Sequence, residues 1–164
     1  MERFVTIRPK NELVSTYISY YYFHDSDEVN FRKNYVFYPH FKHGFTVYRE
    51  KESFRTLFSM NYRRQIPVEL KGIFQKIGVA FNPLGINHFV SGPVSESYNP
   101  ETFVFSHWNP EIFPELNEVF ETREIELKRD LLDAIFEKRF KPNPGLKQVE
   151  EALRYVFESF GTIQ

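Results

Sequence analysis

The sequence predicts an α+β fold, with an antiparallel β-barrel or sandwich followed by two to three C-terminal helices. Short runs rich in Phe, Tyr, Val and Thr fill the first half of the 164-residue chain, and Gly, Pro or Asn bounds them, as is typical of antiparallel strands. After residue 109 the apolar residues instead recur every three to four positions, as on amphipathic helices. The core has to be largely aromatic, because the chain contains 19 Phe and 10 Tyr but few Ala.

The first predicted elements are a short helix and an aromatic strand. Residues 9–17 predict the helix, because apolar side chains lie four apart and Asn11 can cap the first turn. Residues 18–23 are almost all aromatic or β-branched and predict a strand. The polar residues 24–28 then predict a loop.

Further strands are predicted along the next fifty residues. Each segment is rich in β-branched and aromatic residues and ends near a Gly, Pro or Asn. Gly72 and Gly78 interrupt the last of them, which therefore predicts one strand or two. The segments are residues 35–38, 45–48, 54–60 and 70–81.

Two helices and a linker follow. Apolar residues between 112 and 120 fall on one helical face, with Pro114 in or just before the first turn. A second helix is predicted from about 124 to 140. Two prolines and a glycine within residues 141–145 predict a linker, so the first domain is predicted to span residues 1–140. Residues 146–164 predict a third helix, with apolar residues at alternating spacings of three and four.

Composition excludes several classes of protein. The formal net charge of −1 argues against a dedicated nucleic-acid binder. The absence of cysteine excludes disulfide scaffolds, thiolate zinc sites and cysteine nucleophiles. Charge is unevenly distributed: residues 30–76 hold ten basic and three acidic side chains, whereas residues 111–139 hold five basic and nine acidic ones. We interpret these blocks as solvated outer faces, with a charged binding surface as the alternative.

Membrane and secretion signals are absent from the sequence. No apolar run approaches the roughly 20 residues that cross a bilayer. The first residues lack the charged and apolar regions of a signal peptide, and no lipidation motif is visible. We therefore expect a soluble, cytoplasmic protein with no membrane partner.

Four segments carry a resemblance to a known family. They are residues 9–22, Pro39 with the strand 45–48, residues 78–89, and the paired helices of 109–140. In this order they resemble the N-terminal regulatory domain of AraC-type transcriptional regulators. The most specific segment is Gly78-Val-Ala-Phe-Asn-Pro-Leu-Gly, which is similar to the strand ending in Phe-x-Pro-x-Gly in that family. The chain departs from the family at Tyr21-Tyr22, where a Tyr-Trp pair is usual.

The resemblance implies a cupin-like barrel that senses a small-molecule effector, forms a homodimer, or does both. Residues 146–164 would then be the first helix of a truncated helix-turn-helix domain, cut from a longer regulator. Contact with DNA would occur only through a C-terminal domain that this sequence lacks. A ligand-free dimerisation module is the alternative. We expect dimer contacts on the apolar side of the second helix, and the alternative is that this side packs against the β half. The residues on that side are Leu127, Leu131, Leu132, Ile135 and Phe136.

Ligand-binding residues are predicted among the aromatic and basic side chains of the β half. Tyrosines of equal parity share a strand face, where they either line a cavity or fill the core. Arg49, at a strand end, could bind an anion through its guanidinium group, whether it points into or out of the barrel. Two loop histidines could lie at a cavity mouth. The predicted residues are Tyr20, Tyr22, Tyr38, His40, His43, Tyr48 and Arg49.

The sequence does not predict catalysis or metal binding. Positions 40 and 43 would point to opposite faces of a strand, and no acidic residue lies between 29 and 50 to complete a metal site. No nucleophile motif and no phosphate-binding glycine loop occurs in the sequence. We therefore expect no cofactor, no metal and no enzymatic activity, with a cupin-like metal-dependent enzyme as the alternative.

Overall fold

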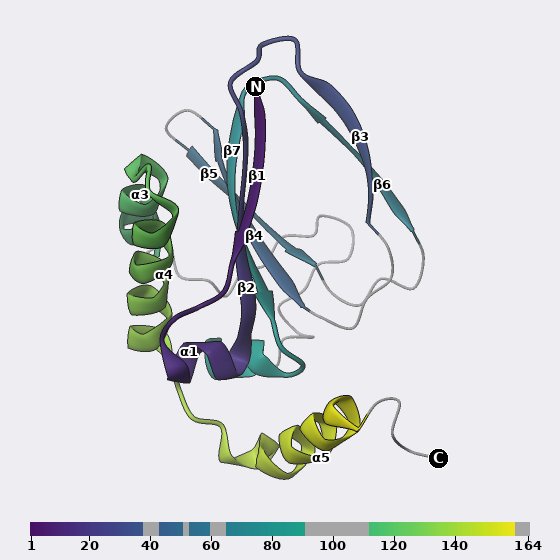
Figure 1. Cartoon of the computed structure of the whole chain (residues 1–164), viewed down its shortest axis with the longest axis vertical. Helices are drawn as coiled ribbons and strands as arrows, with labels where there is room; N and C mark the ends of the chain where they lie inside the picture. Colours follow the sequence, from purple (N-terminus) through teal and green to yellow (C-terminus); the bar gives the residue numbers. More distant parts are fainter. Residues whose placement is uncertain (38–42, 51–52, 60–64, 91–111, 160–164) are drawn as a thin grey trace.

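The computed structural model describes residues 1–37, 43–50, 53–59, 65–90 and 112–159. These residues form an α+β fold (Figure 1). The strands are β1 (Glu2–Ile7), β2 (Ile18–Ser26), β3 (Arg32–Phe37), β4 (Gly44–Glu50), β5 (Ser53–Ser59), β6 (Ile66–Lys71) and β7 (Phe74–Phe81). The α-helices are α1 (Glu12–Tyr17), α3 (Ile112–Glu121), α4 (Ile125–Arg139) and α5 (Lys147–Glu158), with short 3₁₀ helices η1 (Gly85–His88) and η2 (Pro144–Leu146).

The described strands form two antiparallel sheets. The larger sheet has the order β1-β2-β7-β4-β5, and the smaller one pairs β3 with β6. Helices α3 and α4 lie on one side of the larger sheet, and the β3–β6 ribbon stands on the other side (Figure 1). The larger sheet therefore has a helix face, which faces α3 and α4, and a cavity face, which faces the ribbon.

Alternation along the strands builds the helix face from odd-numbered residues of the central strands. Tyr21, Phe45 and Phe81 are almost completely buried there, and Phe136 of α4 packs against Tyr21 and Phe81 with ring centroids 6.1 Å apart in both pairs. Burial of several aromatic side chains dominates the stability of such a core. Apolar residues of α3 and α4 complete it: Leu116, Val119, Phe120, Leu132 and Ile135.

A buried carboxylate joins α4 to the N-terminal helix. Asp133 accepts hydrogen bonds from the hydroxyl of Tyr21 at Oδ1 and from the backbone amides of Lys10 and Asn11 at Oδ2, all at 2.8 Å. Asn11 in turn caps α1 by accepting from the amide of Val14, which confirms the predicted cap. Burial, followed by the charge of Asp133, raises the pKa of Tyr21, which keeps the phenol protonated.

Two predictions about the N-terminal strands were wrong or incomplete. Residues 24–28 were expected to form a loop, but His24–Ser26 continue β2, and the segment Glu2–Ile7 forms a strand that the sequence pattern did not indicate. The cause is tertiary pairing, because β1 and β7 flank β2 along this stretch and satisfy its backbone groups. Residues 70–81 divide between β6 and β7, with Gly72 at a positive φ of 71° in the turn.

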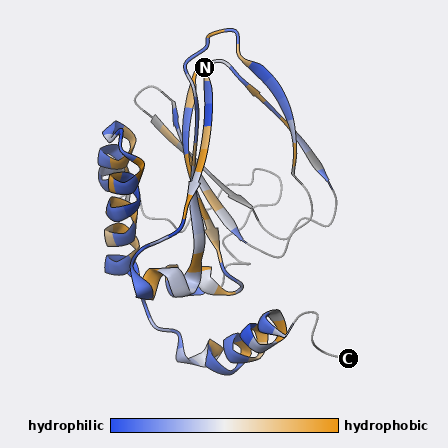
Figure 2. Cartoon of the chain, in the orientation of Figure 1, coloured by the Kyte–Doolittle hydropathy of each residue, from blue (hydrophilic) through white to orange (hydrophobic). Residues whose placement is uncertain are grey.

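The helices match the prediction closely. Pro114 lies in the first turn of α3, where its missing amide hydrogen disrupts no helical bond. Helix α4 and the helix after the Pro/Gly segment are present, and Figure 2 shows hydrophilic and hydrophobic segments alternating along α5. None of the helices in the described ranges is both long and apolar enough to cross a membrane.

Candidate ligand cavity

A cavity of about 920 Å³ lies between the cavity face of the larger sheet and the β3–β6 ribbon. Even-numbered residues of β1, β2, β4 and β7 form one wall, because alternate side chains of a strand point to the same face. The ribbon supplies the opposite wall. The described lining residues are Glu2, Phe4, Thr6, Tyr20, Tyr22, His24, Lys33, Tyr35, Val36, His43, Gly44, Val68, Leu70, Lys76 and Ala80.

A glycine sets the floor of the cavity. The ring of Tyr22 extends from β2 across Gly78 on β7, and its hydroxyl is hydrogen-bonded to Oγ1 of Thr46 on β4. A Cβ atom at position 78 would overlap this ring, so only glycine permits the arrangement. Three strands are thereby bridged by one aromatic side chain, which closes the sheet beneath the cavity.

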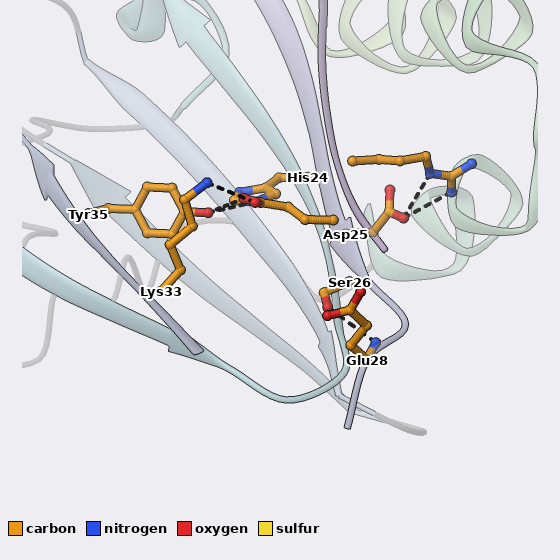
Figure 3. A network of polar contacts seen from close by, with 8 residues as sticks. His24, Asp25, Ser26, Glu28, Lys33 and Tyr35 are labelled. Atoms are coloured by element: carbon orange, nitrogen blue, oxygen red, sulfur yellow. Dashed lines mark hydrogen bonds and ion pairs between the residues drawn. The ribbon is translucent and has the colours of Figure 1, made fainter. Parts of the chain in front are cut away.

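A hydrogen-bonded cluster at one end of the cavity is centred on Glu2. The carboxylate accepts from the Tyr35 hydroxyl, from Nζ of Lys33 at 2.9 Å and from Nε2 of His24 at 2.8 Å. Figure 3 shows Lys33 and Tyr35 extending from β3 toward His24 on β2. The hydrogen bond from Tyr35, followed by that from Lys33, lowers the pKa of Glu2 to about 2. The cluster joins the ribbon to the larger sheet.

His24 belongs to this cluster but is surrounded by aromatic rings. Its ring is 2% exposed and makes edge contacts with Phe4 at 5.3 Å and Phe74 at 5.0 Å between centroids. Burial, followed by the nearby charge of Lys76, lowers the pKa of His24. The imidazole is therefore neutral at pH 7 and donates through Nε2 to Glu2.

Lys76 is a buried cation in the wall of the cavity. Its side chain is 6% exposed, and its ammonium group lies 5.7 Å from the ring centroid of Tyr48 and 5.9 Å from that of Phe74. Burial lowers the pKa of Lys76 to about 8, so the side chain is mostly protonated at pH 7. Aromatic faces attract a cation at this range, but they do not replace its hydrogen bonds to water.

The structure brings together three of the predicted ligand-binding residues. Tyr20, Tyr22 and His43 line the cavity, and Tyr48 is buried beside Lys76 on the same sheet face. Arg49 lies on the helix face instead, because its position on β4 has the opposite parity.

Arg49 contacts α3 rather than the cavity. Its guanidinium lies 2.5 Å from Oε1 of Glu121 and 5.8 Å from the ring centroid of Phe120. The other two predicted residues, Tyr38 and His40, lie outside the described residues.

The five residues predicted for dimer contacts lie mostly in the core. Leu132, Ile135 and Phe136 are buried against the sheet, and Leu131 packs at the edge of the same cluster. Leu127 is 46% exposed. Their packing is the alternative that the sequence left open, namely contact between this helix and the β half.

Sequence reasoning did not single out the charged residues of the cavity. Glu2 and His24 lie outside the segments that the sequence predicts as strands, so alternation gives no prediction for the direction of their side chains. Lys76 had a usable signal, because it is a lysine inside the apolar strand Phe74–Phe81 and shares its parity with Gly78 and Ala80. Its neighbours on the same strand face, Phe74 and Gly78, are both uncharged, which is typical of a face that points into the interior.

A second hollow of about 620 Å³ lies between α5 and the region of α1 and the end of β7. Nε2 of His88 in η1 lies 2.6 Å from Oε1 of Glu150 in α5, and this contact ties α5 to the β half. Within the described ranges, no group of three or more His, Asp or Glu side chains is arranged to hold a metal ion.

Comparison with known proteins gives no relative: no family model, no curated protein and no solved structure matches the chain. The fold and its cavity define an α+β domain with a ligand-sized hollow between two sheets. Any function therefore has to be argued from that site and from the sequence motifs.

Proposed function

We propose that this chain is the domain of an AraC-type transcriptional regulator that senses an effector, mediates dimerisation, or does both. The observation that carries the proposal is the cavity of about 920 Å³ between the two sheets. Apolar pockets with a few oriented polar groups are typical binding sites for small molecules. The regulator class rests on the order of the motifs in residues 9–22, 39–48, 78–89 and 109–140.

The cupin-like barrel or sandwich is part of this proposal. Support comes from the position of the β3–β6 ribbon, which faces the larger sheet across the cavity. The Glu2 cluster links the two sheets at one end through Lys33 and Tyr35. In a cupin-like arrangement the ligand would lie between these walls.

Regulation would proceed by a population shift. An effector that binds one arrangement of the domain more tightly increases the population of that arrangement, and so changes how a DNA-binding half is presented. The contact between His88 and Glu150 supports this coupling, because it connects the β half to α5. Residues 146–164 would be the start of the DNA-binding half.

The sensing role is tested by filling the cavity. Ala80 lines it, so Ala80→Phe should occupy volume that a ligand needs, whereas Ala134→Phe places the same side chain on the exposed side of α4. In a thermal-shift screen of small metabolites, we expect at least one compound to raise the Tm of the wild type and of Ala134→Phe but not of Ala80→Phe. Equal shifts in all three proteins, or no shift with any compound, would contradict sensing.

The regulator class has its own test. The proposal predicts that the coding sequence beyond codon 164 specifies two helix-turn-helix units. A stop codon at that point would contradict the AraC-type assignment and leave the cavity as a binding site of another kind of protein.

One observation favours dimerisation without a ligand as a second function. Helix α5 exposes Val149 and Val156 at 50% and 46%, although both belong to its predicted apolar stripe. Sedimentation of the wild type should then show a dimer that the double substitution of both valines by Lys dissociates. A strictly monomeric wild type at high concentration would contradict this function.

A further inference from the structure

The cavity contains a cation, Lys76, that forms no ion pair with a carboxylate of the described residues. Within the described part of the chain, no hydrogen bond or ion pair reaches Nζ of Lys76, whose described contacts are the rings of Tyr48 and Phe74. The side chain of Lys76 is only 6% exposed, and it lines the cavity. A lysine with so little exposure whose ammonium group makes no hydrogen bond to the described residues is energetically costly, so a partner supplied from outside would bind favourably.

Glu2, the carboxylate among the described lining residues, attracts Lys76 electrostatically but is hydrogen-bonded to other donors. Glu2 accepts from Lys33, Tyr35 and His24, and these contacts also join the ribbon to the sheet. Glu2 and Lys33 cancel each other in charge, and neutral His24 adds none. Lys76 therefore leaves the described lining with a net charge of one positive unit.

The remaining walls fit an apolar molecule. Phe4, Tyr20 and Tyr22 line one side, and Val36, Val68 and Leu70 of the ribbon line the other. These side chains can bury an aliphatic or aromatic body by the hydrophobic effect. The floor formed by Tyr22 over Gly78 keeps this body between the two sheets.

We propose that the cavity binds an apolar monocarboxylate whose carboxylate group pairs with the ammonium of Lys76. This inference rests on the proposed sensing function and names the class of its effector. A single cation matches a single carboxylate, whereas a phosphate dianion would need further donors that Lys33 does not offer while Glu2 holds it. An amine of the same shape would be repelled, and a neutral alcohol would leave Lys76 without a counter-ion.

The experiment uses two matched sets of probes. Straight-chain and phenyl-substituted monocarboxylates of increasing length are compared with the alcohols of identical skeleton, by isothermal titration calorimetry at pH 7. The proteins are the wild type, Lys76→Met and the control Lys71→Met, which removes an exposed lysine from the end of β6. Thermal unfolding of each variant verifies that it is folded before titration.

We expect at least one carboxylate to bind the wild type ten-fold or more tightly than its alcohol. Lys76→Met should abolish this preference, and Lys71→Met should retain it. If acids and alcohols bind equally, or if Lys76→Met keeps the preference, the carboxylate assignment is overturned while sensing survives. If neither set binds, the carboxylate assignment fails, and the metabolite screen with Ala80→Phe then decides separately whether the cavity senses anything.

Discussion

The two faces of the larger sheet differ in how they treat buried polar groups. On the helix face, the buried carboxylate of Asp133 receives three hydrogen bonds from the protein itself. On the cavity face, the ammonium of Lys76, a residue only 6% exposed, donates none to the described residues and lies beside two aromatic rings. The first arrangement is complete and stabilises the fold, whereas the second is incomplete and costs stability.

This difference separates a polar group that stabilises the fold, Asp133, from one that can bind a ligand, Lys76. Native proteins satisfy almost all of their buried polar groups, so an exception calls for an explanation. On the helix face, α3 and α4 pack against the sheet with apolar side chains. On the cavity face, Lys76 lines a cavity of about 920 Å³ that can admit a partner.

Asp133→Ala should have the largest effect on stability. The substitution leaves the hydroxyl of Tyr21 buried without its acceptor and removes two bonds to the start of α1, so we expect a loss of about 3–5 kcal/mol. Urea unfolding measures it, with Asp130→Ala as the control, since Asp130 is an exposed acid on the same helix. A loss below about 1 kcal/mol would show that the helix face does not depend on this carboxylate.

Lys76→Met should stabilise the protein, which is the opposite of the effect expected for Asp133→Ala. Between pH 8 and 10.5 the unfolded chain binds more protons at Lys76 than the folded one, so wild-type stability rises with pH through this window. At pH 7 the variant avoids the cost of burying a charged lysine, and we expect its free energy of unfolding to rise by roughly 1–3 kcal/mol. Urea unfolding at pH 7 and pH 10 should show the gain shrinking; a gain that is independent of pH would contradict the burial of a charged lysine.

Gly78→Ala tests the floor of the cavity. The new methyl group overlaps the ring of Tyr22, and overpacking of this kind typically costs about 1–3 kcal/mol. A double-mutant cycle with Tyr22→Ala, measured by unfolding, tests the cause of this cost. Gly78→Ala should cost almost nothing in the Tyr22→Ala background, because the ring is then absent. An unchanged cost in that background would place the strain elsewhere.

Glu121→Gln should have the smallest effect. The pair between Arg49 and Glu121 is partly solvent-exposed, and such pairs are worth about 0.2–1 kcal/mol. Thermal unfolding should show a decrease within that range, smaller at high salt. Because Arg49 lies on the helix face, carboxylate binding should be unaffected; weakened binding would mean that the two faces are coupled.

Much of the fold could be predicted from the sequence because its signals are local. The cap at Asn11, the position of Pro114 and the apolar period of α4 depend on neighbours a few residues away. The strand at Glu2–Ile7 could not be predicted in this way, since its side chains are mostly polar or exposed. It becomes a strand only by pairing with β2.

The cavity could be predicted only in part. Parity predicts that Tyr20 and Tyr22 share one face of their strand, which requires only the period of a strand. Tyr48 lies on the same sheet face because of the register between β4 and β7, which the sequence pattern does not give. Glu2, Lys33 and His24 come from three strands whose association depends on the whole sheet and ribbon. Arg49 differs in position by one residue from Tyr48, and that single step moves it to the other side of the sheet.

The imidazole of His88 has a defined tautomer. Its Nδ1 accepts a hydrogen bond from the amide of Asn143 at 3.3 Å, which fixes the proton of the neutral ring on Nε2, where it is donated to Glu150. The two nitrogens therefore have distinct chemical shifts in ¹⁵N NMR spectra. Release of α5 would free the ring to exchange between tautomers, so this histidine is a built-in spectroscopic reporter of where the last helix lies.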